Sequence, residues 1–187
     1  MLINFPSNPT GGAMTREDYE KLVPIIKESG IIVISDEIYA ELSYEEPFST
    51  LASFPEIRDQ IVVINGFSKA YAMTGWRLGY VLANPVLSKA MCKIHQYIIM
   101  SAPTGAQYGA IDGLRHCDKE VEEMRASYLS RRNFLVKTFN DMGLHTFNPM
   151  GAFYVFPCIR STGLTSEEFC EEPVSYTHLR AHETRHD

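Results

Sequence analysis

The sequence has few cysteines and no excess of positive charge. Its 187 residues include four cysteines, none of them in a CxxC pair: Cys92, Cys117, Cys158 and Cys170. This spacing does not match a zinc site or a disulfide framework, so we expect reduced thiols and no bound metal. The formal net charge of −6 disfavours nucleic acid as a partner, because nucleic-acid-binding surfaces are basic.

Long apolar runs are also lacking. No stretch reaches the length of about 20 residues that a membrane-spanning helix needs, so we expect no membrane partner. The first ten residues, MLINFPSNPT, lack the charged start and apolar centre of a secretory signal peptide. These two observations predict a cytoplasmic protein.

The first half of the chain alternates between helical and strand-like patterns. Residues 3–12 are rich in turn-forming residues, and 15–30 form a predicted helix with Thr15 as N-cap, Asp18 three residues later and Gly30 at its end. Short β-branched or apolar runs then predict strands over 30–35, 60–65 and 77–83. Such runs are typical of parallel strands buried on both faces, so the pattern predicts an α/β fold with a mainly parallel sheet flanked by helices.

The second half is predominantly helical by pattern. We expect helices over 84–102, 104–116 and 118–143, the last of them amphipathic and closed by Gly143. The segment GAFYVFP, residues 151–157, returns to a strand-like pattern.

The last fifteen residues, 173–187, differ in character from the rest. They contain three of the six histidines, His178, His182 and His186, at a spacing that would place them on one helix face as a stripe of metal ligands. The segment PVSYTHLRAHET, however, is identical to the translation of a transposon-end sequencing adapter. We therefore interpret 173–187 as a non-native tail and not as a metal site.

Polar residues gather where the predicted strands end. Strand ends in α/β sheets are where ligand sites assemble. An acid, a phenol, an amine and a guanidinium at this place would suit a ligand with a phosphate, an aromatic nitrogen and a reactive carbonyl. The candidate site residues are Asn8, Asp36, Tyr39, Ser68, Lys69 and Arg77.

Three motifs carry a family resemblance. SNPTGG (7–12), SDEIY (35–39) and GFSKAYAMTGWRLG (66–79) resemble, in order and approximate spacing, the pyridoxal 5'-phosphate (PLP) site of the class I and II aminotransferases of fold type I. The resemblance implies that Lys69 forms a Schiff base with the cofactor and is the catalytic residue. It also implies that Asp36 pairs with the pyridine nitrogen and keeps it protonated, so that the ring withdraws electrons from the substrate.

The resemblance assigns the other candidate residues to the ring oxygen and the phosphate. Asn8 and Tyr39 would hydrogen-bond the 3-oxygen of the ring, and Arg77 would hold the phosphate as a bidentate fork, with a hydroxyl from Ser68. Many relatives carry a serine three residues before the lysine, where this chain has Gly66. That difference implies a phosphate hydrogen bond that is missing or made by the backbone.

Family members are about twice as long as this chain, so the resemblance implies part of a larger protein. We assign 1–142 to part of the PLP-binding large domain with its connecting helices, and 143–172 to the start of the small C-terminal domain. We expect the complete protein to be a homodimeric aminotransferase acting on an L-amino acid and a 2-oxo acid, and the 187-residue chain to be impaired. Two alternatives share the motifs: a PLP-dependent C–S β-lyase and the PLP-sensing domain of a transcription regulator.

Overall fold

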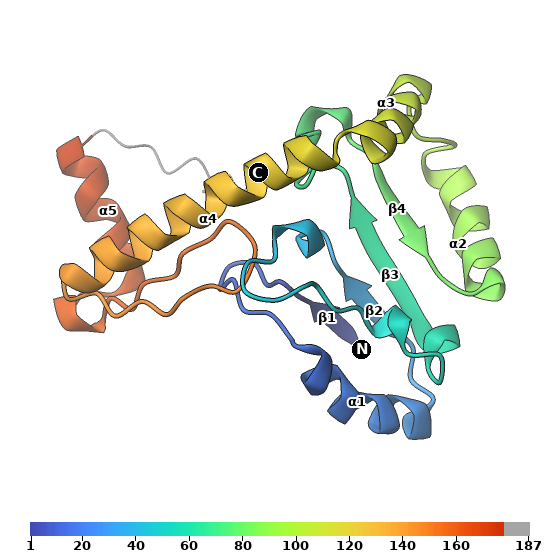
Figure 1. Ribbon diagram of the computed structural model, residues 1–187, viewed down its shortest axis with the longest axis horizontal. Helices are drawn as coiled ribbons and strands as arrows, with labels where there is room; N and C mark the ends of the chain where they lie inside the picture. Colours follow the sequence, from blue (N-terminus) through green and yellow to red (C-terminus); the bar gives the residue numbers. More distant parts are fainter. Residues whose placement is uncertain (178–187) are drawn as a thin grey trace.

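A computed structural model describes residues 1–177 of the chain (Figure 1). Residues 178–187 lie outside the described part, and with them His178, His182 and His186. Residues 173–177 of the tail belong to the last described helix, and no observation tests the interpretation of 173–187 as non-native, which stays a prediction. Within residues 1–177, no cluster of three His, Cys, Asp or Glu side chains is arranged to hold a metal ion. None of the described helices is both long and apolar enough to cross a membrane.

Four strands form one sheet in the order β1-β2-β3-β4: β1 (Leu2–Asn4), β2 (Val33–Asp36), β3 (Ile61–Gly66) and β4 (Gly79–Leu82). The first three strands are parallel, and β4 runs antiparallel to β3. The three expected strands and the mainly parallel sheet are thus confirmed. β1 was not predicted, because it is only three residues long and lies beside a segment dominated by turn formers.

Helix α1 (Arg16–Ser29) covers one face of the sheet. Its N-terminus has the predicted capping box between Thr15 and Asp18, and Gly30 ends it in the left-handed region at φ 64°. Its buried residues Tyr19 and Ile26 belong to a core cluster that also contains residues of β1, β2, β3 and the 51–57 connection. Local capping and this burial together maintain a helix that contains Pro24.

The opposite face of the sheet is less covered than the sequence predicted. Ile34 of β2 and Ile64 of β3 are each 38% exposed, although the apolar runs indicated burial on both faces. Val33 and Val63, their neighbours in sequence, point into the α1 side and are buried. The expectation of strands buried on both faces is therefore wrong at Ile34 and Ile64, which lie on the face that α1 does not cover, although Val62 of β3 is buried.

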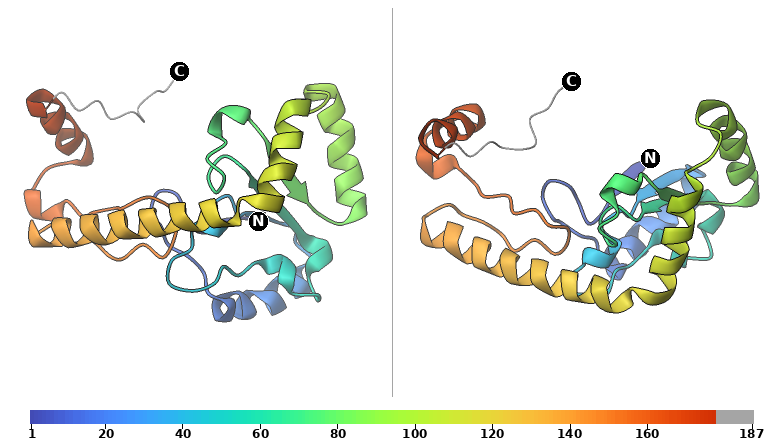
Figure 2. Two further views of the ribbon diagram at one scale, coloured as in Figure 1. Left: turned by 45° about the horizontal axis from the view of Figure 1, so that its top comes forward. Right: turned by 90° about the horizontal axis from the view of Figure 1, so that it is seen from above.

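Four further helices follow the sheet: α2 (Pro85–Ile98), α3 (Thr104–His116), α4 (Asp118–Asp141) and α5 (Ser166–Thr177). Both views in Figure 2 show α4 extending well beyond the sheet toward α5. The three predicted helices are confirmed, but the expected apolar face of α4 is at most half-buried, and Phe134 on it is 69% exposed. Only Arg132 and Val136 are buried on this helix.

The segment 151–157 is not a strand, contrary to the prediction. Gly151 forms an isolated antiparallel bridge with Ser43, and no regular ladder continues from it. Ala152 has φ 59°, in the left-handed region, where the extended backbone of a strand is impossible. The chain that follows α4 returns along this helix to the strand ends, and residues 151–157 then lead away toward α5 (Figure 1). At the point of return, the backbone N–H groups of Met150 and Gly151 donate to the carbonyl of Gly11.

Gly66 and Gly79 face each other across β3 and β4. A Cβ on Gly66 would lie 3.1 Å from the Cα of Gly79 and 3.1 Å from the carbonyl oxygen of Leu78. Both neighbours are backbone atoms, so they cannot move aside like the end of a flexible side chain. The close approach of the two strands therefore explains why glycine occupies position 66.

We expect Gly66→Ala to lower the free energy of unfolding by about 1–3 kcal/mol, because the two strands must separate to admit the methyl group. Gly75→Ala is the matched control, since a Cβ there meets nothing within 4 Å. Urea denaturation followed by circular dichroism compares the two variants. Equal stabilities for both would show that the contact between Gly66 and Gly79 does not constrain the sheet.

Candidate functional site

The site lies at the edge of the sheet where the three parallel strands end. Asn4 and Asp36 are paired in the register of β1 and β2, and each is the last residue of its strand. The Asn4 side-chain amide donates to the backbone carbonyl of Asp36 (3.4 Å), and its Oδ1 accepts from the N–H of Asn8 (3.2 Å). Asn4 thus connects two predicted site residues. The sequence analysis missed it because nothing local distinguishes it.

Asp36 has one carboxylate oxygen engaged by its own turn. Its Oδ1 accepts a hydrogen bond from the backbone N–H of Ile38 at 3.2 Å. This contact fixes the direction of the side chain just after the strand. Asp36 is half-buried, so the carboxylate can still meet a ligand at the strand ends.

Lys69 sits in a tight turn that follows β3. The carbonyl of the buried Phe67 accepts hydrogen bonds from the backbone N–H groups of Tyr71 and Met73. The Nζ of Lys69 lies 5.7 Å from the centre of the Tyr39 ring and 5.2 Å from that of Phe153. Within the described part of the chain, Nζ makes no hydrogen bond or ion pair. The amine is therefore held by ring contacts and has no acidic partner among these residues.

Three aromatic rings form the wall beside this amine. Tyr39 is buried and packs edge-on against Phe153, with ring centres 5.4 Å apart. The hydroxyl groups of Tyr39 and Tyr154 are 2.6 Å apart, a hydrogen bond in which either can donate. Phe153 and Tyr154 were not among the predicted site residues. Their aromatic character was visible, but the segment was assigned to a strand and lies more than 80 residues from Lys69.

Ser68 and Arg77 belong to the same turn as Lys69. Arg77 is exposed, has φ 54° and donates from Nη1 to the carbonyl of Thr74 at 2.9 Å. The Thr74 hydroxyl donates in turn to the carbonyl of Ser68 at 3.1 Å. Thr74 was missed by the sequence analysis. The guanidinium keeps further N–H donors facing solvent, where an anion can be bound.

Glu37 is a buried carboxylate directly after Asp36, and the sequence analysis assigned it no role. Its Oε1 accepts hydrogen bonds from the hydroxyls of Ser35 (2.9 Å) and Thr50 (2.6 Å). Burial raises the pKa of Glu37, and these two hydrogen bonds oppose that rise. Through them Glu37 ties the end of β2 to the 47–51 connection.

A cavity of about 550 Å³ lies elsewhere, beside the 40–48 loop and the start of α4. Its lining is acidic, with Glu41, Glu45 and Glu122 beside Arg125. None of the predicted site residues lines it. The hydrogen bonds and ring contacts at the strand ends therefore define the candidate site better than cavity size does.

The comparisons with known proteins agree with the motifs. The family model described as "Aminotransferase class I and II" matches residues 1–183. The protein YugH of Bacillus subtilis (strain 168), provisionally named as an aminotransferase, is 49% identical over 172 residues, which are 92% of this chain and 45% of that protein. The aspartate aminotransferase of Pyrococcus abyssi is 43% identical over 91% of this chain and 45% of its own length.

Solved structures are similar in fold as well. The aromatic aminotransferase from Pyrococcus horikoshii OT3 has a TM-score of 0.89 and 43% identity, covering 92% of this chain and 47% of that one. The aspartate aminotransferase from Thermotoga maritima has a TM-score of 0.86 and 37% identity, covering 94% and 45%. The chain therefore spans somewhat less than half of the length of the relatives it matches.

The raised pKa of Glu37 predicts a pH-dependent stability. The pKa of the Glu37 carboxyl is higher in the folded state than its ordinary value of 4.5. The folded protein therefore loses stability as the pH rises from 4.5 to the raised pKa, because the carboxyl ionises more readily in the unfolded chain. We expect Glu37→Gln, whose amide oxygen can still accept from Ser35 and Thr50, to be more stable than the parent above that window. The difference should shrink below pH 4.5, where the parent carboxyl is protonated.

Thermal unfolding at a series of pH values measures this effect. The exposed Glu56→Gln is the control, and its stability should follow that of the parent at every pH. Glu37→Ala should cost about 1–3 kcal/mol, because it leaves the buried hydroxyl of Ser35 and the partly buried hydroxyl of Thr50 without their acceptor. A constant difference between Glu37→Gln and the parent across the whole pH range would contradict the assignment.

Proposed function

This chain belongs to the class I and II aminotransferase family, and we propose that the complete protein moves an amino group between an L-amino acid and a 2-oxo acid with the help of PLP. The proposal rests on the position and surroundings of the Lys69 amine. This half-buried amine lies at the strand ends, between two aromatic rings and without a carboxylate partner among the described residues. The relatives' names favour amino transfer over a C–S β-lyase or a PLP-sensing regulator.

The donor set at the site fits PLP. A free amine suits its aldehyde, an exposed guanidinium with spare N–H donors suits its phosphate, and a half-buried carboxylate suits its ring nitrogen. When bound, PLP supplies an electron-withdrawing ring that stabilises negative charge on the substrate carbon. The chain's own residues would bind it, orient it and move protons.

Lys69 and Asp36 have the chemical roles in this proposal. Lys69 Nζ would hold the cofactor covalently until the substrate amine replaces it, and would then carry the proton that leaves the substrate carbon. Asp36 would keep a proton on the ring nitrogen through a charge-assisted hydrogen bond. Its fixed direction, set by the N–H of Ile38, favours that contact.

The remaining residues would bind and orient the cofactor. Tyr39 and Asn8 would hydrogen-bond the ring oxygen, and Arg77 and Ser68 would bind the phosphate. The turn that contains Ser68, Thr74 and Arg77 supports this assignment, because its internal hydrogen bonds hold both phosphate-binding residues in one loop.

The domain assignment and the partners belong to the same proposal. Residues 1–142 would form part of the large domain and 143–172 the start of the small one, in a cytoplasmic homodimer. Helix α2 has no buried residue, and Tyr97 on it is 86% exposed, which favours a further protein surface on that helix. Because the matched relatives are more than twice as long, we expect this 187-residue chain alone to be impaired in turnover.

Covalent binding of PLP tests the role of Lys69 directly in this chain. After incubation with PLP and reduction with borohydride, peptide mass spectrometry should find the cofactor on Lys69. Lys69→Ala should lose the adduct, whereas the exposed Lys93→Ala on α2 should retain it. Labelling of other lysines at the parent yield in Lys69→Ala would refute the assignment.

Activity of the complete protein tests the reaction. We expect amino acid donors to be converted only when a 2-oxo acid is present, and Lys69→Ala to reduce the rate by at least ~10²-fold, the contribution typical of a positioned acid–base group. Amino acids from the donor and acceptor pairs are quantified by chromatography. Release of ammonia and a thiol without a 2-oxo acid would instead show a lyase.

A further inference from the structure

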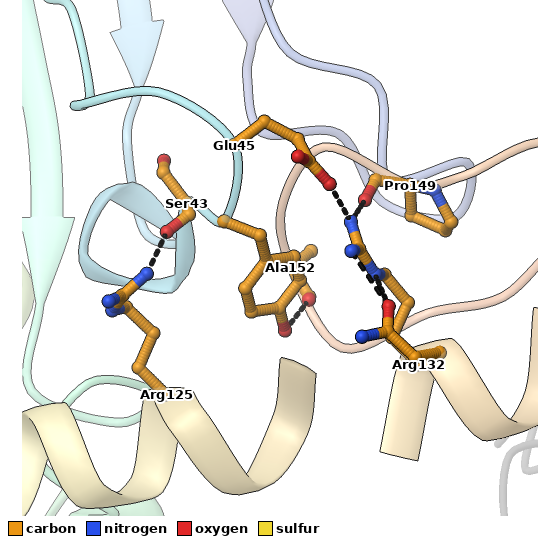
Figure 3. Close-up of polar contacts among 8 residues, drawn as sticks. Ser43, Glu45, Arg125, Arg132, Pro149 and Ala152 are labelled. Carbon is orange, nitrogen blue, oxygen red and sulfur yellow. Dashed lines mark hydrogen bonds and ion pairs between the residues drawn. The ribbon is translucent and has the colours of Figure 1, made fainter. Parts of the chain in front are cut away.

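Arg132 is the buried cation of α4, with a side chain that is only 9% exposed. Its Nη1 donates to the carbonyl of Pro149 (2.7 Å) and forms an ion pair with Glu45 (2.6 Å), while Nε and Nη2 donate to the side chain of Asn133 (Figure 3). One guanidinium thus joins three segments: α4, the loop after the 40–42 turn, and the segment that follows α4. The fork of donors makes this possible, and a lysine cannot reproduce it.

Tyr44 makes a second connection to the same segment. Its hydroxyl donates to the carbonyl of Ala152, and its backbone N–H donates to the carbonyl of Met150 at 2.9 Å. The guanidinium of Arg132 lies 5.2 Å from the centre of its ring. Burial raises the pKa of Tyr44 to about 12, so the hydroxyl remains a donor at any ordinary pH.

Arg132 and Tyr44 hold the backbone immediately before the aromatic residues Phe153 and Tyr154. Ala152 has φ 59° and donates its N–H to the carbonyl of Leu42 at 3.0 Å. The next residue, Phe153, lies beside the amine of Lys69, and Tyr154 shares a hydrogen bond with the hydroxyl of Tyr39. A left-handed residue turns the chain sharply, so a shift at Pro149 or Ala152 would change the direction of both aromatic side chains.

We propose that Arg132 and Tyr44 are positioning residues of the site, which act through Phe153 and Tyr154 on the amine of Lys69 and the hydroxyl of Tyr39. Arg132 and Tyr44 donate hydrogen bonds to the 149–152 segment, and among the described residues neither side chain bonds Lys69. The proposal concerns the place of the Lys69 amine. It rests on the proposed function only in treating that amine as the reactive group.

Nuclear magnetic resonance of the amine itself tests the proposal without PLP. Reductive methylation with ¹³C-formaldehyde labels the lysine amines of the chain, and Lys69→Arg identifies the Lys69 signal. Because Nζ lies beside two rings, the parent signal should be displaced by ring currents from those of exposed lysines. Arg132→Lys and Tyr44→Phe should move it toward the exposed lysines, since Phe153 is no longer held in place.

Matched substitutions separate this effect from general damage. Arg115→Lys and Tyr108→Phe make the same changes at exposed positions of α3 and should leave the Lys69 signal unchanged. In a Phe153→Leu, Tyr154→Phe background, Arg132→Lys should cause no further displacement, because the path through the aromatic residues is already broken.

PLP attachment supplies a second readout. Arg132→Lys should weaken the attachment of PLP to Lys69 by about tenfold, which is the size of coupling found between residues of one network. The matched control Arg115→Lys should leave the attachment unchanged. A displaced Lys69 signal in the parent chain, together with a complete protein that takes up no PLP, would refute the proposed function and leave the positioning role intact. A Lys69 signal without displacement in the parent would overturn the positioning proposal.

A purely structural role predicts a different result. Arg132→Lys would then lower the melting temperature and leave the Lys69 signal at its parent position, which would overturn the proposal. If Arg132→Lys does not fold, Tyr44→Phe decides, because it removes one hydrogen bond and keeps the buried ring. An unchanged Lys69 signal in folded Tyr44→Phe would count equally against the positioning role.

Discussion

Parallel hydrogen bonding between β1, β2 and β3 is the constraint on which the rest of the structure depends. Because the three strands run in the same direction, the residues at their carboxyl ends share one edge of the sheet. Asn4 and Asp36 are aligned there by register, and the turn that carries Lys69 begins at the end of β3. A shift of one residue in register would turn the side chain of Asp36 to the opposite face of the sheet.

A second layer of contacts completes this edge from a distant part of the chain. The backbone from Pro149 to Ala152 is bound to Gly11, Leu42, Tyr44 and Arg132, so the aromatic residues that follow it are held beside Lys69. Lys69 places an amine beside aromatic rings, and Asp36 places a carboxylate at the end of β2. Membership of the aminotransferase family gives this arrangement a chemical explanation. Glu37 contributes at a different level, because its hydrogen bonds tie β2 to the neighbouring connection.

Individual elements show where sequence patterns predict structure well and where they do not. Helix α1 could be predicted because Thr15, Asp18 and Gly30 act within a few residues of the helix they begin or end. β1 was missed because its three residues become a strand only by pairing with β2, some thirty residues away. The strand expected over 151–157 was wrong because contacts with Leu42 and Tyr44 hold Ala152 in a left-handed conformation that an apolar pattern does not encode.

The sequence by itself determined the family, the fold class and the identity of the candidate residues, because motifs such as SNPTGG, SDEIY and GFSKAYAMTGWRLG specify chemistry through residue type and local spacing. Only the tertiary structure decided which side chains surround those residues. Phe153 reaches Lys69, Tyr154 reaches Tyr39, and Arg132 holds the segment that carries both aromatic residues. The first two contacts join positions more than 80 residues apart, and all three depend on how the folded backbone returns to the sheet rather than on any local pattern.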